Sequence, residues 1–181
     1  MKLLWSQDKF NKAFIIAANA HNGQKIPGSE LPYIIHVALV CTELMAVISK
    51  QNNCDLIMQC AALHDTLEDT NLSYDFLLNE FGKDIANGVL SLSKNHNLEK
   101  TLQLEDSINR ILKQPQDIWM IKMADRIVNL NEPPSFWTND KKISYHKQSK
   151  SIYNAFKTSN FQLANRLKSK IEDYNVYIIG C

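Results

Sequence analysis

The sequence predicts an all-α protein, a compact bundle of roughly eight to ten helices as counted from the breaks between apolar patterns. Three observations support this fold class. Apolar residues recur every three or four positions along most of the chain, which is the spacing of a helix face that packs on a core. Glycine and proline number only 5 each and gather at a few points. No alternating apolar and polar stretch is long enough to predict a strand.

The expected helices follow one another between these breaks. Apolar stripes at residues 10–18, 37–48 and 56–63 mark the first three. Ser73 predicts the start of a fresh helix, because a serine hydroxyl can accept hydrogen bonds from the free N–H groups at a helix N-terminus. Later stripes lie at residues 85–92, 104–112, 118–128, 152–156 and 163–171.

The composition is typical of one ordinary globular domain. A chain of 181 residues can bury one core, so we expect residues 1–181 to form a single domain, with the C-terminal helices (about 140–178) packing on it. Hydrophobic residues make up 45% and charged residues 22%, which favours neither disorder nor a membrane protein. Since the net charge is only +1, no overall field attracts nucleic acid or an anionic membrane. An anionic ligand must be bound by a local cluster.

The four cysteines do not predict a disulfide framework. Cys41, Cys54, Cys60 and Cys181 form no C-x-x-C pair, and three of them lie in or beside apolar helical segments. This placement favours reduced or buried thiols. Polar residues at positions 6–9 interrupt any signal-peptide core, and no apolar run reaches about 18 residues. We therefore expect a cytoplasmic protein, and the sequence leaves its oligomeric state open.

The most informative segment is residues 61–70, an apolar run that ends in His64, Asp65, Glu68 and Asp69. On a continuous helix His64 and Glu68 are four residues apart, and so are Asp65 and Asp69. One imidazole and three carboxylates would therefore face the same region. Close carboxylates repel one another unless a cation lies among them or one is protonated. A divalent metal site is one interpretation. The other is an exposed helix end whose histidine bonds a backbone carbonyl.

Two further segments place polar groups in apolar surroundings. His36 follows an apolar stretch and begins a helix, where a lone histidine is more often structural than a ligand. Lys122, Asp125, Arg126 and Asn129 form a polar stripe on an otherwise apolar helix. Such a stripe taken alone is more often a solvated face.

Taken together and in this order, the motifs resemble the HD superfamily, in which His, then His-Asp, then Asp bind a metal. HDTLEDT at 64–70 and KMADRIVNL at 122–130 resemble in particular the hydrolase domain of the RelA/SpoT type and the small alarmone hydrolases, which include the metazoan SpoT homologues. Residues 17–25 and 32–36 are similar to the same family. The resemblance runs from about residue 10 to at least 150 and implies an HD-domain bundle.

The activity that this resemblance implies is metal-dependent 3′-pyrophosphohydrolysis of stringent-response alarmones. (p)ppGpp, (p)ppApp or both would be converted to GDP or GTP, or to ADP or ATP, with release of pyrophosphate. Because the chain ends about where the family's hydrolase domain ends, we expect hydrolysis without synthesis. The alternatives are a different HD-domain nucleotide phosphohydrolase and a non-catalytic alarmone-binding module.

The resemblance also implies roles for individual residues. The positions that match the family's metal ligands are His36, His64, Asp65 and Asp125. The family usually binds Mn²⁺, which nitrogen and oxygen ligands suit, although this ligand set does not exclude iron, zinc or cobalt. Glu68 and Asp69 match the catalytic carboxylates that activate the attacking water and protonate the leaving oxygen. Such help is needed because the ribose 3′ oxygen is a poor leaving group.

Substrate contacts are implied at five positions, namely Lys25, Lys94, Asn129, Lys141 and Tyr145. Lys25 and Asn129 correspond to nucleotide contacts, and Lys94 to a phosphate contact. Lys141 and Tyr145, four apart on one helical face, correspond to contacts with the 5′ phosphates. An ordinary solvated charge is the alternative for each lysine. Arg126 is expected to orient carboxylates or pair with them rather than bind substrate.

The chain departs from the family pattern just after Asn129. Many relatives continue with a basic residue, whereas this chain continues with Leu130-Asn131-Glu132-Pro133-Pro134. This edge of the site would face the purine, so the preference between guanosine and adenosine alarmones stays open.

Overall fold

The computed structural model describes residues 4–50 and 52–178. Within them the chain forms ten α-helices and one 3₁₀ helix, so the predicted all-α bundle is confirmed. The α-helices are α1 (Gln7–Ala20), α2 (Ile34–Met45), α3 (Cys54–Leu63), α4 (Thr66–Asp69), α5 (Tyr74–Phe81), α6 (Lys83–Leu92), α7 (Gln103–Leu112), α8 (Gln116–Asn129), α9 (Asn139–Phe156) and α10 (Phe161–Asp173), and the 3₁₀ helix η1 is Tyr174–Tyr177. Strand-like pairing in this part of the chain is limited to one isolated bridge, between Lys25 and Pro32.

Several helices begin at a residue whose side chain caps the helix. Ser6, Asn53, Ser73, Thr138 and Asn160 each accept a hydrogen bond from the backbone N–H three residues later. Replacing such a cap by alanine typically costs about 1 kcal/mol. The predicted helix start at Ser73 is therefore confirmed.

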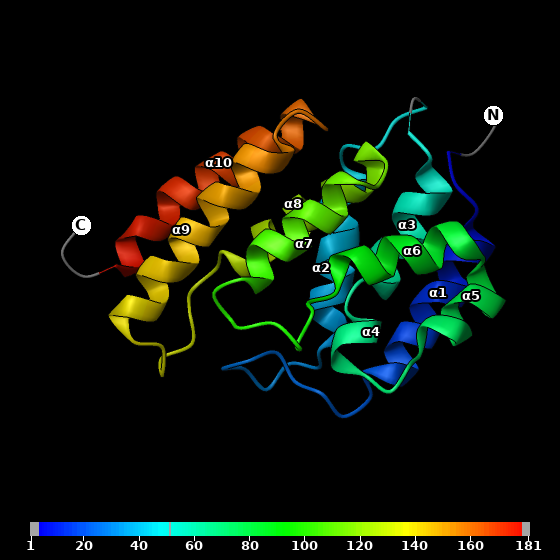
Figure 1. Cartoon of the computed structure of the whole chain (residues 1–181), viewed down its shortest axis with the longest axis horizontal. Helices are drawn as coiled ribbons and strands as arrows, with labels where there is room; N and C mark the ends of the chain where they lie inside the picture. The colour runs from blue at the N-terminus through cyan, green and yellow to red at the C-terminus, as the bar shows by residue number, and fades with distance from the viewer. Residues whose placement is uncertain (1–3, 51, 179–181) are drawn as a thin grey trace.

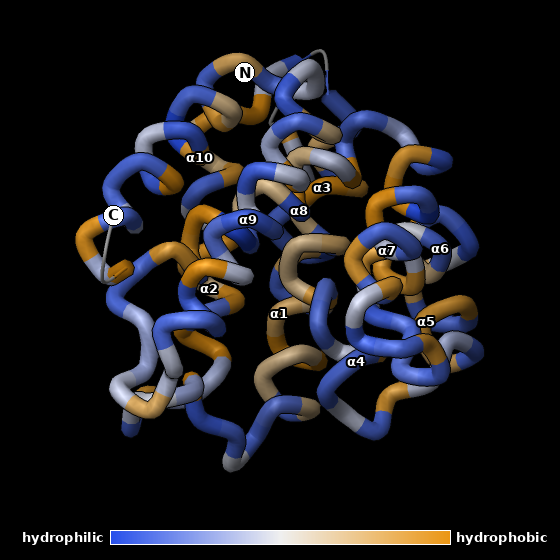
Figure 2. The backbone as a smooth tube through the Cα atoms, turned by 60° about the vertical axis from the view of Figure 1, so that its left-hand side comes forward, coloured by the Kyte–Doolittle hydropathy of each residue, from blue (hydrophilic) through white to orange (hydrophobic). Residues whose placement is uncertain are grey.

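The core is organised around α3 and α8. Every residue of α3 except Asp55 is buried, and the helix contacts α1, α2, α6 and α8. Helices α9 and α10 run side by side along α8 at one end of the molecule, with α1 and α5 at the other (Figure 1). Hydrophilic and hydrophobic residues alternate along α9 and α10 in Figure 2, as expected for helices that turn one face to the core.

Two close approaches of the backbone require glycine. A Cβ at Gly88 of α6 would lie 2.8 Å from Sγ of Cys60 and 2.9 Å from Cδ1 of Ile118, so α6 packs tightly on α3 and α8. A Cβ at Gly28 would lie 2.9 Å from Cβ of Pro134, and Gly28 has a φ of +79°, a region that glycine adopts at little cost. The loop before α2 therefore lies directly against the loop after α8.

The segment at residues 61–70 differs from the expected continuous helix. Helix α3 ends at Leu63 and α4 begins at Thr66. The Thr66 hydroxyl donates a 2.7 Å hydrogen bond to the Leu63 carbonyl, and such a side-chain bond competes with regular helix bonding. The helix that was expected to reach Ile48 likewise ends earlier, at Met45.

Three of the four cysteines lie within the described residues. Cys41, Cys54 and Cys60 are free and buried, as predicted, while Cys181 lies outside the described residues. In the part of the chain that the structure describes, every helix is too short or too polar to span a bilayer.

Candidate metal centre and catalytic cavity

The four predicted metal ligands come from three parts of the chain and meet. His36 lies in the first turn of α2, His64 and Asp65 lie between α3 and α4, and Asp125 lies in α8. Nε2 of His36 lies 3.3 Å from Nε2 of His64. Oδ2 of Asp65 is 2.8 Å from Nε2 of His64 and 3.5 Å from Nε2 of His36. Oδ1 of Asp125 approaches from α8, 3.6 Å from Nε2 of His36.

This set of donors fits a divalent cation. His36, His64 and Asp65 each offer one ligand atom, and these atoms lie within 4.8 Å of one another, with Asp125 at the edge of the group. Nδ1 of His64 is 2.9 Å from the Ala61 carbonyl, so its N–H donates there, and Nε2 is the nitrogen that would bind a metal once its proton is released. The backbone contact proposed as the alternative to metal binding therefore exists, but it uses the other nitrogen.

Charges in the group shift one another's pKa. Burial lowers the pKa of His64, but the adjacent Asp65 carboxylate outweighs burial and raises it to about 9. Burial raises the pKa of Asp65, but His64 and His36 hold it well below its usual range. For Asp125 the ammonium of Lys122, 3.0 Å away, outweighs burial and brings the pKa to about 2. Both carboxylates are thus ionised at neutral pH, as ligands to a cation must be.

Two hydrogen bonds help to fix the positions of Asp65 and Asp69. The Tyr33 hydroxyl donates a 2.6 Å bond to Oδ2 of Asp65. Nε2 of Gln24 donates a 2.6 Å bond to the Asp69 carbonyl, and its Oε1 lies 2.8 Å from Nδ1 of His21. The sequence did not predict either contact. Its only relevant signal was the similarity of residues 17–25 and 32–36 to the family.

The two predicted catalytic carboxylates lie beside the metal ligands in different surroundings. The Glu68 side chain is 7% exposed, forms an ion pair with the Lys94 ammonium, and accepts a 2.7 Å bond from the Lys94 backbone N–H. Asp69 is exposed on its outer side. Its pKa is raised, mainly because partial burial penalises its charge and also because Asp65 and Glu68 lie close by. The Asp69 carboxyl group therefore takes up a proton more readily than an ordinary exposed aspartate does.

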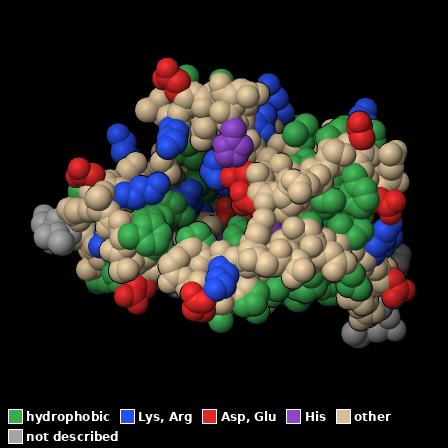
Figure 3. All heavy atoms as spheres, turned by 90° about the horizontal axis from the view of Figure 1, so that it is seen from below, with side chains coloured by type: hydrophobic (Ala, Val, Ile, Leu, Met, Phe, Trp, Pro, Cys, Tyr) green, Lys and Arg blue, Asp and Glu red, His purple; other side chains and the backbone are tan. Residues whose placement is uncertain are grey.

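These residues line one cavity of about 440 Å³, the catalytic cavity. Four acidic residues line it, and they are Asp65, Glu68, Asp69 and Asp125. Five basic residues also line it, and they are Lys94, Lys100, Lys122, Arg126 and Lys141. Figure 3 shows blue and red side chains meeting around a central hollow. A cation held by the carboxylates and a polyanion held by the basic residues would complement this mixed lining.

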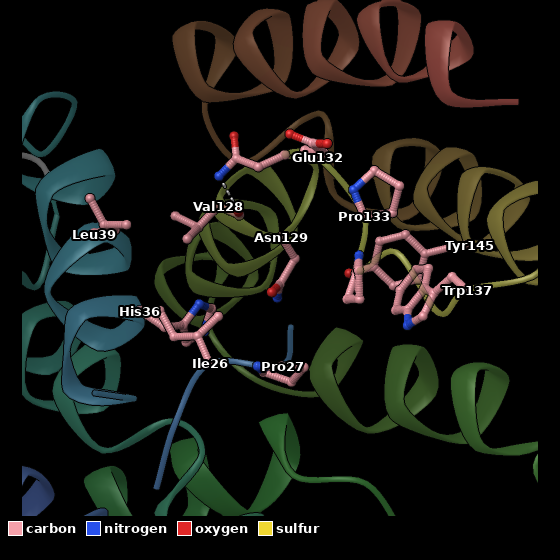
Figure 4. Close-up of a pocket in the computed structure, with 12 residues that line it drawn as sticks. Ile26, Pro27, His36, Leu39, Val128, Asn129, Glu132, Pro133, Trp137 and Tyr145 are labelled. Carbon is pink, nitrogen blue, oxygen red and sulfur yellow. Dashed lines mark hydrogen bonds between the residues drawn. The ribbon is translucent and has the colours of Figure 1, made fainter. Parts of the chain in front are cut away.

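A more apolar pocket of about 240 Å³ adjoins the catalytic cavity. Asn129, Trp137 and Tyr145 line both spaces. In Figure 4, Asn129 lies between Ile26 and Pro27 on one side and the two aromatic rings on the other. Apolar walls with a few polar groups are typical of sites that bind a flat organic group.

Four of the five predicted substrate residues line the catalytic cavity, and they are Lys94, Asn129, Lys141 and Tyr145. Lys25 is not among the lining residues. It forms an ion pair with Glu30 on the same loop.

Arg126 does not have the expected partner. It is 7% exposed and forms no ion pair with any carboxylate of the described residues, so the expected pairing is wrong. Its guanidinium carbon lies 4.0 Å from the centre of the Tyr145 ring, and its Nη1 lies 3.4 Å from Oγ of Ser149. The guanidinium thus adds a positive charge to the lining of the cavity without an ion-pair partner among the described residues.

Curated relatives with similar sequences are alarmone enzymes. The chain is 28% identical over 166 residues to guanosine-3′,5′-bis(diphosphate) 3′-pyrophosphohydrolase MESH1 of Drosophila melanogaster, a match that covers 88% of this chain and 90% of that protein. MESH1 of Xenopus tropicalis is 24% identical, covering 90% of this chain and 92% of that protein. The bifunctional (p)ppGpp synthase/hydrolase SpoT of Escherichia coli K12 is 32% identical over 80% of this chain, but the chain spans only 21% of SpoT.

Solved structures show the same relationship. A metazoan orthologue of SpoT, described as hydrolysing ppGpp and acting in starvation responses, has a TM-score of 0.81 and 26% identity, covering 93% of this chain and 96% of that one. A Listeria monocytogenes protein with a TM-score of 0.65 and 16% identity, covering 81% of this chain and 99% of that one, shares the fold. No protein-family model matches the chain. The resemblance to the RelA/SpoT-type small hydrolases and the HD-domain fold are confirmed.

Proposed function

We propose that this chain, a homologue of the MESH1 hydrolases, removes pyrophosphate from the 3′ position of a purine nucleotide alarmone of the (p)ppGpp type. One observation carries the proposal: two buried histidines and two carboxylates converge at a cavity that five basic side chains also line. That arrangement provides for a metal and for a polyphosphate in the same space. (p)ppApp is proposed as a further substrate, because this chain departs from the family pattern at residues 130–134, the edge expected to face the purine.

We assign the metal to His36, His64, Asp65 and Asp125, and we propose Mn²⁺ as the ion because every donor is nitrogen or oxygen. When bound, such an ion lowers the pKa of a ligated water and offsets charge on the phosphate. Other divalent metals with the same ligand preference are compatible with this donor set.

Glu68 and Asp69 are assigned to the proton transfers. Asp69, whose pKa is raised, is suited to deliver a proton to the ribose 3′ oxygen as the bond to phosphorus breaks. Glu68, fixed by two contacts with Lys94, is suited to orient the attacking water and take its proton. The division supplies both an acid and a base within one cavity.

The nucleotide is assigned to the remaining lining residues. The apolar pocket, with Asn129 at its edge, receives the nucleoside, and Lys94, Lys141 and Tyr145 contact phosphates. Lys25 would contact the nucleotide only after leaving Glu30. We further propose that residues 1–181 act as one cytoplasmic hydrolase-like domain, with a small-molecule substrate. The free thiols are consistent with a reducing compartment.

Product analysis tests this function. The purified protein with Mn²⁺ is offered ppGpp, pppGpp, ppApp and pppApp, with GTP and dGTP as controls, and pyrophosphate and the nucleotide products are quantified. We expect pyrophosphate from at least one 3′-pyrophosphorylated nucleotide, intact controls and loss of turnover in Glu68→Gln. Hydrolysis of GTP or dGTP would indicate a different phosphohydrolase. Tight alarmone binding without turnover would indicate a binding module.

A further inference from the structure

A small basic side pocket opens from the catalytic cavity. It has a volume of about 80 Å³, well below the range of about 300–1,000 Å³ of pockets for drug-sized ligands. Lys94, Lys100, Lys122 and Arg126 line both this pocket and the catalytic cavity, and Ser107 of α7 lies in its far wall. None of its described lining residues also lines the apolar pocket. The catalytic cavity therefore has an apolar extension and a separate basic one.

Positive charge in the basic side pocket is only partly balanced. Lys94 pairs with Glu68, and the Lys122 ammonium lies 3.0 Å from Oδ2 of Asp125. Lys100 and Arg126 have no carboxylate partner within the described ranges, and no acidic residue lines the pocket. Leaving a buried guanidinium without a counter-charge is costly, so an anion bound here would stabilise the folded protein.

Two residues that line the pocket also carry hydrogen-bond donors without partners. Oγ of Ser107 and Nε of Arg126 are buried, and neither bonds any residue that the structure describes. Ser107 is 3% exposed and Arg126 is 7% exposed. Roughly 90% or more of buried polar groups in proteins are satisfied, so two unsatisfied donors on the lining residues of one pocket favour a bound acceptor nearby. Hydroxyl, guanidinium and ammonium groups together match the oxygens of a phosphate.

We propose that the basic side pocket binds the distal phosphate of the 3′ pyrophosphate group, the one not attached to ribose. This inference rests on the proposed function. With the nucleoside in the apolar pocket and the scissile phosphorus beside His64 and Asp65, the basic side pocket is the part of the cavity that shares no lining residue with the nucleoside site and stays available to the pyrophosphate end.

The pocket then holds the leaving product during the reaction. The water oxygen bonds to the phosphorus next to ribose, and the bond from that phosphorus to the 3′ oxygen breaks. The 3′ oxygen takes up a proton, and the water proton passes to a carboxylate. The distal phosphate keeps its contacts throughout. Arg126 and Lys100 would therefore bind pyrophosphate, but they would not contact a single phosphate bound at the metal.

Binding of inorganic pyrophosphate and inorganic phosphate to the metal-loaded protein tests the inference. Isothermal titrations at fixed free Mn²⁺ compare the wild type with Lys100→Ala and Ser107→Ala. Lys113→Ala at the end of α7 is the matched control, because this lysine lies outside the basic side pocket. Each pocket variant is expected to weaken pyrophosphate binding about tenfold or more, the effect of one charge-assisted hydrogen bond, and to leave phosphate binding unchanged.

Folding and function are separated by two further measurements. Ser107→Ala should melt at or above the wild-type temperature, because it removes a buried hydroxyl that has no protein partner. Alarmone turnover with wild-type pyrophosphate affinity in both pocket variants would overturn this inference and leave the proposed function standing. Failure to hydrolyse any alarmone, combined with pyrophosphate binding that depends on Lys100, would overturn the proposed function and keep the pyrophosphate site.

Discussion

Asp65 and Asp69 lie four residues apart, yet their surroundings shift their pKa values in opposite directions. Two imidazoles outweigh burial and lower that of Asp65, whereas partial burial near other carboxylates raises that of Asp69. The first carboxyl is therefore held as an anion for metal binding, and the second is suited to carry a proton. Identical side chains acquire different chemistry from their contacts.

Substitutions at these acids should separate metal binding from turnover. Asp65→Ala and Asp125→Ala remove ligands from a set of four and should lose most of the metal, as measured by elemental analysis of the purified protein. Asp69→Ala and Glu68→Ala should keep near-normal metal content and lose about 10²-fold or more in kcat, the usual contribution of a general acid or base. Equal metal loss in all four variants would contradict this division of roles.

Tyr33 is predicted to position Asp65. Tyr33→Phe removes the donor of the 2.6 Å bond to Oδ2 and should weaken metal affinity about 10-fold to 100-fold, as is typical when a residue that holds a ligand is lost. Titration calorimetry of the metal-free protein with Mn²⁺ measures the effect. Tyr74→Phe is the control, because its hydroxyl bonds Asn87 far from the metal ligands. Unchanged affinity in Tyr33→Phe would assign the tyrosine to packing alone.

Among the connecting elements, the loops on either side of the apolar pocket meet at Gly28. Gly28→Ala and Gly82→Ala both force alanine into a positive φ, with values of +79° and +84°, at a cost of about 1–3 kcal/mol each. Only at Gly28 would the new Cβ also press on Pro134, 2.9 Å away, whereas nothing lies within 4 Å at Gly82. We expect both variants to lose stability, but a raised KM for the nucleotide only in Gly28→Ala. Equal KM values would show that the loop contact does not shape the pocket.

Helices α9 and α10 are joined by a buried histidine whose pKa is lowered. Burial and then Lys150 disfavour the charged form of His146, although its Nε2 lies 3.1 Å from the Ile171 carbonyl. Its folded pKa lies below the unfolded value of 6.5, so the unfolded chain binds the proton first and stability falls as pH drops through that range. When the pH is lowered from about 7.5 to about 5.5 with saturating metal, the melting temperature of the wild type should fall further than that of His146→Gln. An equal fall in both proteins would mean that a group other than His146 causes the pH dependence.

At the scale of elements, the sequence predicts what depends on neighbouring residues and misses what depends on contacts between distant ones. Apolar spacing predicts the helices, and Ser73 predicts the start of α5, because both effects act within a few residues. The contacts of Tyr33 with Asp65 and of Gln24 with Asp69 span 32 and 45 residues and leave no local pattern. The break between α3 and α4 was also missed, since the Thr66 hydroxyl competes with the backbone there.

At the scale of the whole molecule, three separate parts of the chain contribute residues to the site. The four proposed metal ligands lie on α2, between α3 and α4, and on α8, and these parts of the chain pack on one another through the core. Family motifs identified these residues, but only the packing shows that His36 meets Asp125 from a different helix. A bound cation would connect these elements as well as take part in the reaction.

Metal removal should therefore lower the stability of the whole fold. A ligand that binds only the folded state stabilises it by about 2.7 kcal/mol at a concentration of 100 times its Kd. For a domain of this size, that corresponds to a rise in Tm of roughly 5–10 °C. Thermal melts of chelator-treated protein, with Mn²⁺ added back in steps, should show a Tm that climbs with metal concentration. Asp125→Ala should show a much smaller climb, and an equal climb in this variant would mean that the stabilising ion binds outside the assigned centre.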